Sequence, residues 1–353
     1  MLKAGVRGVR ALRFADHLSL EAVSGCLRPK FNPGECSRSI SARGISTSDS
    51  CTQKSTPNNG HQIKNVTVVG VGLMGAGIAQ VAAQNDFNVT IVDEQDEYLQ
   101  KGMVIIRKSL DRITKKKFPN EPKGAEKFID DTLSKISTSV NLQKSVENSD
   151  LVIEAITENI ETKQILFSKI DDVAPERAIF ASNTSSLSIT EIAKSSKRKD
   201  RFGGLHFFNP VPMMALVEVI RTPQTTNESY STLFNFVKDL GKRPVACKDT
   251  PGFIVNRLLI PYMMEAVRMM ERGEASPEDI DTAMKLGAGY PMGPFELLDY
   301  VGLDTTKYVI SGWHNIYKDH PLFEPSQSLN SLVEEGKLGR KTGEGFYKYK
   351  KSK

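Results

Sequence analysis

Short apolar runs alternate with longer segments of mixed polarity over residues 66–220. The runs are continuous and rich in β-branched residues, which is typical of parallel strands that are buried on both faces. Helical periodicity follows in segments such as 76–84 and 158–170. This alternation predicts an α/β fold built on a parallel sheet. The predicted strands are residues 66–69, 88–92, 151–155, 178–182, 202–208 and 214–220.

The hydrophobic pattern changes near residues 248–252, Lys-Asp-Thr-Pro-Gly. Beyond this point the period is helical, and Gly and Pro separate the helices. The predicted helices are residues 253–271, 277–286, 294–317 and 328–336. We therefore expect two domains, residues 62–249 and an all-helical domain of residues 250–353. Residues 253–270 are apolar on nearly all sides, so this helix should be buried centrally or at a subunit interface.

A glycine-rich turn joins the first predicted strand to the first predicted helix. Its sequence is Gly70-Val71-Gly72-Leu73-Met74-Gly75. In this strand–turn–helix context the glycines predict dinucleotide binding. The first permits the tight turn, the second lets the backbone approach a pyrophosphate, and the third lets helix and strand pack closely. Taken alone, the glycines are also compatible with a purely structural turn.

An acidic residue, Asp93, follows the second predicted strand. A carboxylate at this position can accept hydrogen bonds from the adenosine ribose hydroxyls, and its charge repels a 2′-phosphate. Together with the glycine turn, it predicts a Rossmann-type domain that binds NAD in preference to NADP. Residues 94–135 are longer than a connection between strands requires, and they predict a helical excursion from the sheet.

The net charge is unevenly distributed. The chain carries 47 Lys and Arg against 42 Asp and Glu, a formal charge of +5, and the whole excess lies in residues 1–47. Four basic residues there fall on one side of a predicted helix: Lys3, Arg7, Arg10 and Arg13. An arginine- and serine-rich, acid-poor leader is typical of an organelle transit peptide, which we expect over residues 1–52 with cleavage within 45–53. A tail without a targeting role is the alternative.

The neutral remainder of the chain narrows the class of protein. It carries no basic stripe with interleaved aromatic residues, so we expect no nucleic-acid partner. It contains no apolar stretch of membrane-spanning length, so we expect no membrane span. HxxxH, CxxC and GxSxG patterns are missing from the sequence, and we therefore expect neither a metal site nor a covalent nucleophile of those types.

His206 is the candidate catalytic base. It lies in predicted strand 202–208, and Glu218 lies in predicted strand 214–220. If these strands pair antiparallel about Pro212, His206 faces Glu218, and opposed Cβ atoms lie ~4.5–5.5 Å apart. A carboxylate at that distance can fix the imidazole tautomer and stabilise the imidazolium, as a general base requires. A core histidine beside an unrelated glutamate is the alternative.

Six motifs in a common order carry a specific resemblance to a known family. They are residues 70–75, 154–159, 182–187, 206–212, 251–257 and 339–347. With these motifs the sequence resembles the L-3-hydroxyacyl-coenzyme A dehydrogenases of the short-chain, mitochondrial type over residues 62–353. The resemblance implies NAD-dependent oxidation of L-3-hydroxyacyl-CoA to 3-oxoacyl-CoA in fatty-acid β-oxidation. It also implies the mitochondrial matrix and a homodimer formed through the helical domain.

The resemblance further implies roles for individual residues. His206 takes the proton of the 3-hydroxyl group while hydride leaves C3 for the nicotinamide, and Glu218 orients His206. Ser185 and Asn256 bind the oxygen atoms of the substrate. The residues that match family positions near the cofactor are residues 70–75, Asp93, Glu158, Lys163, Ser185, Asn209 and Lys341. Those that match positions contacting coenzyme A are Ser109 and Lys116.

Several of these residues also have a purely structural interpretation. Ser185 can be the N-cap of a helix over 187–193, because serine is a favoured N-cap residue. Glu158 can be an ordinary acidic residue at the start of a helix, where it interacts favourably with the helix dipole. Asn256 fits a polar position on a buried helix, and Lys115–Lys117 fit a solvated charged face.

Two other functions also fit the sequence. One is a hydroxyacid or sugar-acid dehydrogenase of the same superfamily that uses no coenzyme A, and the other is an NAD-binding structural protein with little turnover.

Overall fold

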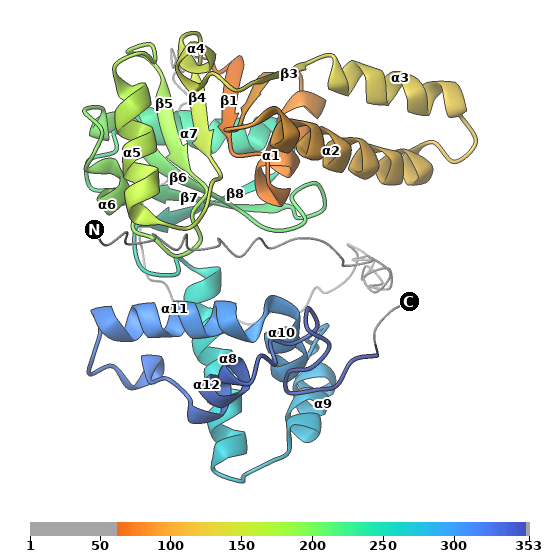
Figure 1. Ribbon diagram of the computed structural model, residues 1–353, viewed down its shortest axis with the longest axis vertical. Coiled ribbons are helices and arrows are strands. Elements are labelled where there is room, and N and C mark those ends of the chain that lie inside the picture. The colour runs from red at the N-terminus through yellow and green to blue at the C-terminus, as the bar shows by residue number, and fades with distance from the viewer. Residues whose placement is uncertain (1–61, 351–353) are drawn as a thin grey trace, which may run out of the picture. The chain divides into compact units, whose positions relative to one another are not determined.

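The computed structural model describes residues 62–350, in which an eight-stranded sheet is followed by a group of helices (Figure 1). The strand order is β3-β2-β1-β4-β5-β6-β7-β8. Strands β1 to β6 are parallel, β7 is antiparallel to β6, and β8 is parallel to β7. The bounds are β1 Asn65–Val69, β2 Asn88–Val92, β3 Ile136–Ser139, β4 Leu151–Glu154, β5 Ile179–Ser182, β6 Phe202–Phe207, β7 Leu216–Arg221 and β8 Arg243–Lys248. The expected α/β fold is confirmed, and its strand order changes direction between β1 and β4, where such sheets bind their ligands.

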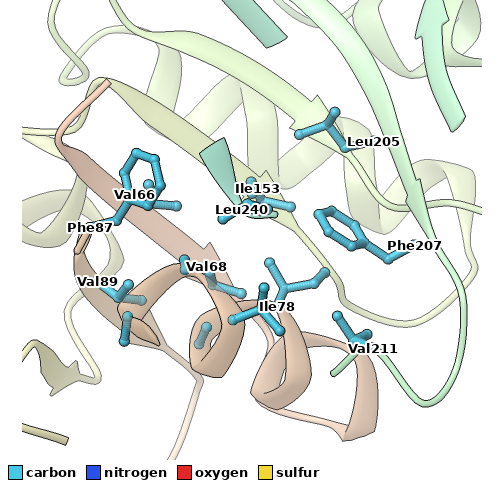
Figure 2. Close-up of a cluster of buried hydrophobic side chains, with 14 of the residues drawn as sticks. Val66, Val68, Ile78, Phe87, Val89, Ile153, Leu205, Phe207, Val211 and Leu240 are labelled. Carbon is cyan, nitrogen blue, oxygen red and sulfur yellow. The ribbon is translucent and has the colours of Figure 1, made fainter. Parts of the chain in front are cut away.

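Helices cover both faces of the sheet. Their bounds are α1 Leu73–Gln84, α2 Asp96–Lys117, α3 Pro122–Leu133, α4 Leu142–Val146, α5 Ile160–Asp171, α6 Ile189–Ala193 and α7 Asn227–Asp239. On one face, helices α1, α2 and α7 form a core with Val68 and Ile153, and Figure 2 shows Ile78 of α1 beside them. On the other face, α5 and α6 pack on Val69 and Val152. Successive strand residues are therefore buried alternately on the two faces, which explains their continuous apolar runs.

Strands β3 and β8 and helix α7 are structural elements that the hydrophobic pattern does not predict. Both strands lie at the edges of the sheet, where one side of the strand faces solvent and polar residues are tolerated. The sequence of β3 is Ile-Ser-Thr-Ser, and its residues are half-buried or exposed. An edge strand of this kind has no apolar run to detect. The expected helical excursion is confirmed as the pair α2 and α3, which pack on each other (Figure 1).

The helical segment has a core of its own. Its helices are α8 Val255–Glu271, α9 Pro277–Gly287, α10 Pro294–Val301, α11 Leu303–Ile316 and α12 Gln327–Glu334. Met263, Phe295 and Trp313 are buried in one cluster. The expectation of a single helix over 294–317 is wrong, because Gly302 divides it with a φ of 102°. Glycine adopts this left-handed conformation readily, and the backbone changes direction there.

Helix α8 is buried only in part. Met263, Met264 and Val267 in its second half are completely buried, as its composition predicts. Ile254, just before the helix, and Leu258 in its first turn are exposed, Leu258 to 70%. Central burial is therefore confirmed for these three residues and wrong for the start of the helix, where the alternative of a subunit interface stays a prediction.

Two further expectations from the sequence concern the transit peptide and membrane-spanning helices. The transit peptide expected over residues 1–52 lies outside the described residues. Among residues 62–350, no helix has the length and apolarity needed to cross a membrane.

Candidate active site

The turn between β1 and α1 has the shape required of a phosphate-binding loop. Gly70 has a φ of 94°, and a Cβ atom there would lie 2.6 Å from the carbonyl oxygen of Ala155. A Cβ atom on Gly75 would lie 1.8 Å from the carbonyl oxygen of Gly70, so only glycine allows α1 to pack this closely. Around Gly72, by contrast, no atom lies within 4 Å of a Cβ position. The first two contacts are structural, and the open space at Gly72 leaves room for a ligand.

The N-terminus of α1 has the features of an anion site. Its N-cap residue is Gly72, and no side chain accepts a hydrogen bond from the first turn. A phosphate can therefore satisfy these N–H groups and the positive end of the helix dipole. Asp93 follows β2, and its Oδ2 accepts a hydrogen bond from the backbone N–H of Val71 at 2.9 Å. Asp93 is thus held beside the glycine turn, as a ribose-binding carboxylate must be, and these residues fit NAD.

The antiparallel pairing of β6 and β7 brings His206 and Glu218 together. The register pairs His206 with Glu218, as predicted from the sequence. The Nδ1 atom of His206 lies 2.7 Å from Oε2 of Glu218. Both side chains are buried, His206 to 97% and Glu218 completely. Phe208 and Phe253 lie on the imidazole with ring centroids 4.4 and 5.5 Å away, so packing as well as hydrogen bonding orients the ring.

Glu218 also holds the start of the helical segment. Its Oε1 atom accepts hydrogen bonds from the backbone N–H groups of Ile254, at 3.0 Å, and Val255, at 2.8 Å. These groups lie at the N-terminus of α8, where a carboxylate interacts favourably with the helix dipole. Phe253, immediately before them, has a φ of 52° and is buried. The same carboxylate therefore contacts the histidine through one oxygen and the next domain through the other.

Ser185 lies next to His206, and Asn256 contacts Ser185. The hydroxyl oxygen of Ser185 is 3.0 Å from Nε2 of His206. Asn256, on the first turn of α8, donates a hydrogen bond from Nδ2 to the carbonyl oxygen of Ser185 at 3.3 Å. The N-cap of α6 is Ser188, so the N-cap interpretation of Ser185 is wrong. Ser185 is exposed and Asn256 is half-buried, and both leave polar atoms available to a ligand.

Glu158 forms a network of hydrogen bonds with the turn after β5. Its Oε1 atom accepts from the Thr184 hydroxyl at 2.5 Å, from the Ser185 N–H at 2.9 Å and from both the N–H and the hydroxyl of Ser186 at 3.1 Å. Lys163 lies 3.2 Å from its Oε2 atom. Burial by itself raises the pKa of Glu158, but the Lys163 charge and these hydrogen bonds hold it below its ordinary value. The helix-start interpretation of Glu158 is therefore wrong, because Asn159 is the N-cap of α5.

The remaining predicted residues lie in four places. Lys163 is 1% exposed, and its ammonium group also contacts Glu154. Asn209 is exposed and precedes Pro210 through a cis peptide bond. The Nζ atom of Lys341 pairs with Asp304 at 2.5 Å. Ser109 and Lys116 both lie on α2, the first half-buried and the second exposed.

The last motif, residues 339–347, surrounds a buried carboxylate. Asp299 accepts hydrogen bonds from the backbone N–H groups of Phe346 and Tyr347, each at 2.9 Å. A Cβ atom on Gly345 would lie 2.0 Å from Oδ1 of Asp299, so the motif needs glycine for this close approach. Burial raises the pKa of Asp299 despite these hydrogen bonds. Most of this motif therefore closes the helical core.

Sequence reasoning missed Glu154 and Asp249. Glu154 ends β4 and is fully buried. Asp249 accepts hydrogen bonds from the hydroxyl of Ser188 at 2.8 Å and from the N–H groups of Ile189 and Thr190 at 2.9 and 2.7 Å. An acidic residue at the end of a continuous apolar strand is the signal that could have identified Glu154, because such a charge is buried only with a partner. Asp249 carries no comparable local signal.

Comparison with known proteins gives a consistent result. The model of the 3-hydroxyacyl-CoA dehydrogenase NAD binding domain matches residues 65–250, and that of the 3-hydroxyacyl-CoA dehydrogenase C-terminal domain matches residues 252–349. Hydroxyacyl-coenzyme A dehydrogenase, mitochondrial, from Rattus norvegicus is 62% identical over 82% of this chain and 92% of its own length. The corresponding protein from Homo sapiens is 60% identical over the same shares.

Solved structures agree with this result. The crystal structure of (S)-3-hydroxybutyryl-CoA dehydrogenase from Ralstonia eutropha has a TM-score of 0.78 at 43% identity, over 82% of this chain and 100% of that chain. The family matches agree with what the site shows: the glycine turn, Asp93 and the buried pair of His206 and Glu218 are all typical of an NAD-dependent dehydrogenase. The chain belongs to the 3-hydroxyacyl-CoA dehydrogenase family and is an NAD-dependent oxidoreductase.

Proposed function

We propose that the protein oxidises L-3-hydroxyacyl-CoA to 3-oxoacyl-CoA in fatty-acid β-oxidation, with His206 as the general base and Glu218 as its partner. The hydrogen bond between His206 Nδ1 and Glu218 Oε2, at 2.7 Å in a buried site, is the observation that carries the proposal. Relatives named mitochondrial hydroxyacyl-coenzyme A dehydrogenases, more than half identical over most of the chain, support the substrate class.

The tautomer of His206 follows from its partner. A carboxylate only accepts hydrogen bonds, so the proton of the neutral imidazole resides on Nδ1 and the lone pair on Nε2. The Nε2 atom faces the Ser185 hydroxyl, on the exposed side of the pair. It can therefore take a proton from a substrate hydroxyl, while Glu218 stabilises the imidazolium that results. When bound, NAD⁺ supplies the redox chemistry by accepting hydride from C3.

Ser185 and Asn256 position the substrate in this proposal. The Ser185 hydroxyl can donate to the 3-oxygen beside Nε2 of His206, and the Asn256 amide lies 3.3 Å from the backbone carbonyl oxygen of Ser185. Two donors that converge near the base limit the orientations of the substrate. Such alignment accounts for a large share of the rate acceleration in hydride-transfer enzymes, because it replaces the entropy loss of a random encounter.

We assign the cofactor to the glycine turn, residues 70–75, with Asp93 at the adenosine ribose. The open space at Gly72 and the uncapped helix N-terminus support this assignment. Glu158, Lys163, Ser185, Asn209 and Lys341 remain proposed cofactor positions on the resemblance. Lys163 has its ammonium group on two carboxylates, which favours an indirect role for it.

We also propose that Ser109 and Lys116 contact coenzyme A. Both lie on α2, seven residues and about two helical turns apart, and thus on one face of the helix. Lys116 is exposed, as a partner for a phosphate must be. A homodimer through the helical domain remains a proposal on the resemblance and on the apolar composition of residues 253–270. The names of the relatives support a mitochondrial location. The matrix and the removal of residues 1–52 are proposed on the resemblance and on the composition of the leader.

The proposal can be tested by following the absorbance of NADH with purified protein and acetoacetyl-CoA. We expect NADH to be oxidised with acetoacetyl-CoA and far less with acetoacetate that carries no coenzyme A. Equal rates with both would favour a hydroxyacid dehydrogenase. Binding of NADH without any turnover would favour a structural protein, and either result would contradict the proposal.

A further inference from the structure

Glu154 and Lys163 form an ion pair in the interior of the first domain. The Nζ atom of Lys163 on α5 donates to Oε1 of Glu154 at the end of β4, at 2.5 Å. The same carboxylate accepts from the Ser182 hydroxyl at 2.5 Å and from the Ile156 N–H at 2.8 Å. The two side chains are 0% and 1% exposed.

Stability is a poor explanation for this pair. Two charges lose their hydration on burial, and well-packed apolar residues of the same volume are often as stable or more stable. A buried ion pair of this kind therefore requires another explanation, and its surroundings supply one. Lys163 contacts a second carboxylate, Glu158, which is 31% exposed and lies toward the active site.

Glu158 carries the interaction to the turn after β5. One of its oxygens faces Lys163 and the other accepts four hydrogen bonds from Thr184, Ser185 and Ser186. The Ser185 hydroxyl in this turn lies 3.0 Å from Nε2 of His206. A continuous series of contacts therefore runs from the buried pair to the nitrogen that we propose as the base.

We propose that Lys163, anchored by Glu154, is a positioning residue for the reaction: it holds Glu158 as a charged acceptor, and Glu158 fixes Ser185 beside His206. This inference rests on the proposed function, because it assumes that His206 and Ser185 act on the substrate. Lys163 does not touch the reacting atoms in this scheme. Its role is to keep Glu158 able to accept all four hydrogen bonds, which a protonated carboxyl group cannot do equally well.

The charged groups around Glu158 determine how its pKa changes when Lys163 is replaced. Lys163 faces Glu158 from α5, with Glu154 of β4 behind it, and His206 of β6 lies beyond Ser185. Without the ammonium group, the burial of Glu158 favours its protonated form, whether or not Glu154 is charged. The pKa of Glu158 then rises, and the turn loses its acceptor at a pH where the normal protein keeps it.

The test uses a variant in which both members of the pair are neutral, Glu154→Gln with Lys163→Met. This double change neutralises Glu154 and Lys163 together, so neither of the two is left as a buried charge without the other. Lys169→Met is the matched control, since Lys169 is on the same helix and is exposed. The substrates are acetoacetyl-CoA and NADH, and kcat, KM, the Kd for NADH and Tm are measured across a range of pH.

We expect the neutral-pair variant to lose about tenfold to a hundredfold in kcat, the effect of a misplaced hydrogen bond to a charged group, and to show a smaller change in the Kd for NADH, since Lys163 is also a proposed cofactor position. Its kcat should recover as the pH rises. Adding Glu158→Gln should lower kcat about tenfold in the normal protein and hardly at all in the variant, because both changes break one series of contacts. Lys169→Met should resemble the normal protein.

Three results would overturn the inference. One is a normal kcat in the neutral-pair variant, and another is an additive effect of Glu158→Gln. The third is a parallel loss of kcat, NADH binding and Tm, which would assign the pair to folding alone. If the normal protein itself fails to oxidise NADH with acetoacetyl-CoA, the proposed function fails instead.

Discussion

His206 and Glu218 face each other across the antiparallel pair β6–β7, with Nδ1 and Oε2 2.7 Å apart. The second oxygen of Glu218 accepts the N–H groups of Ile254 and Val255 at the start of α8. One buried carboxylate therefore orients the imidazole and anchors the helical segment. A change at Glu218 should accordingly affect both the chemistry and the stability of the protein.

Replacement of the base, His206→Gln, should lower kcat by about 10²–10⁴-fold, the usual contribution of a positioned general base. Glutamine cannot take the proton of the 3-hydroxyl at neutral pH, yet it leaves the glycine turn unchanged. Steady-state kinetics with acetoacetyl-CoA and a fluorescence titration with NADH would measure the two effects separately. Near-normal turnover in this variant would remove His206 as the base.

Replacement of the carboxylate partner of His206, Glu218→Gln, should move the imidazole proton of His206 from one ring nitrogen to the other. If the amide oxygen accepts the N–H groups of Ile254 and Val255, the amide NH₂ faces Nδ1 of His206, and the imidazole proton must move to Nε2. The base then has no lone pair toward the substrate. We expect kcat to fall at least about tenfold and Tm to fall as well, since a hydrogen bond to a charged group is worth about 1.5–3 kcal/mol.

The control for this variant is Glu228→Gln on α7, where the side chain is exposed. It should leave kcat unchanged and lower Tm much less than Glu218→Gln does, since an exposed acid in the first turn of a helix contributes only about 0.3–1 kcal/mol. If Glu218→Gln retained full activity and stability, the buried carboxylate would have neither of the two roles assigned to it.

Two alanine substitutions separate the structural glycine from the binding glycine. At Gly72, φ is −61° and the Cβ position is open, so Gly72→Ala should fold normally and raise the Kd for NADH about tenfold, equivalent to ~1.4 kcal/mol. At Gly75, the Cβ atom meets the carbonyl oxygen of Gly70, so Gly75→Ala should lower the free energy of unfolding by about 1–3 kcal/mol or more. Thermal unfolding and NADH titration measure these effects. A normal Kd for NADH in Gly72→Ala would contradict the assignment of Gly72 to the pyrophosphate, and an equal loss of Tm in both variants would contradict an open Cβ position at Gly72.

The preference for NAD should depend on the charge of Asp93. Asp93→Asn keeps an oxygen to accept the Val71 N–H but removes the negative charge beside the 2′ position of the adenosine ribose. We expect kcat/KM to fall about tenfold for NADH and to rise for NADPH. The ratio of the two values in the variant and in the normal protein is the measurement. An unchanged ratio would mean that the Asp93 carboxylate does not bind the adenosine ribose.

Much of this site could be predicted because its signals are local. The glycine turn and Asp93 lie within one strand–turn–helix–strand segment, where backbone geometry alone dictates the residue types. The pairing of His206 with Glu218 could be predicted because a short turn fixes the register of two antiparallel strands. The break at Gly302 was missed because the apolar period continues across it, and a single residue of positive φ redirects the chain.

The amino-acid sequence by itself determined the fold class, the dinucleotide turn and the facing pair of strands, since each depends on neighbours along the chain. Only the tertiary structure decided how Glu154, Lys163 and Glu158 connect to Ser185, and how Glu218 reaches the start of α8. The contacts of Glu158 with Ser185 and of Glu218 with Val255 join residues that are 27 and 37 positions apart along the chain. No periodicity records them, because buried charges are placed by the packing of whole elements and by the need of each charge for a partner.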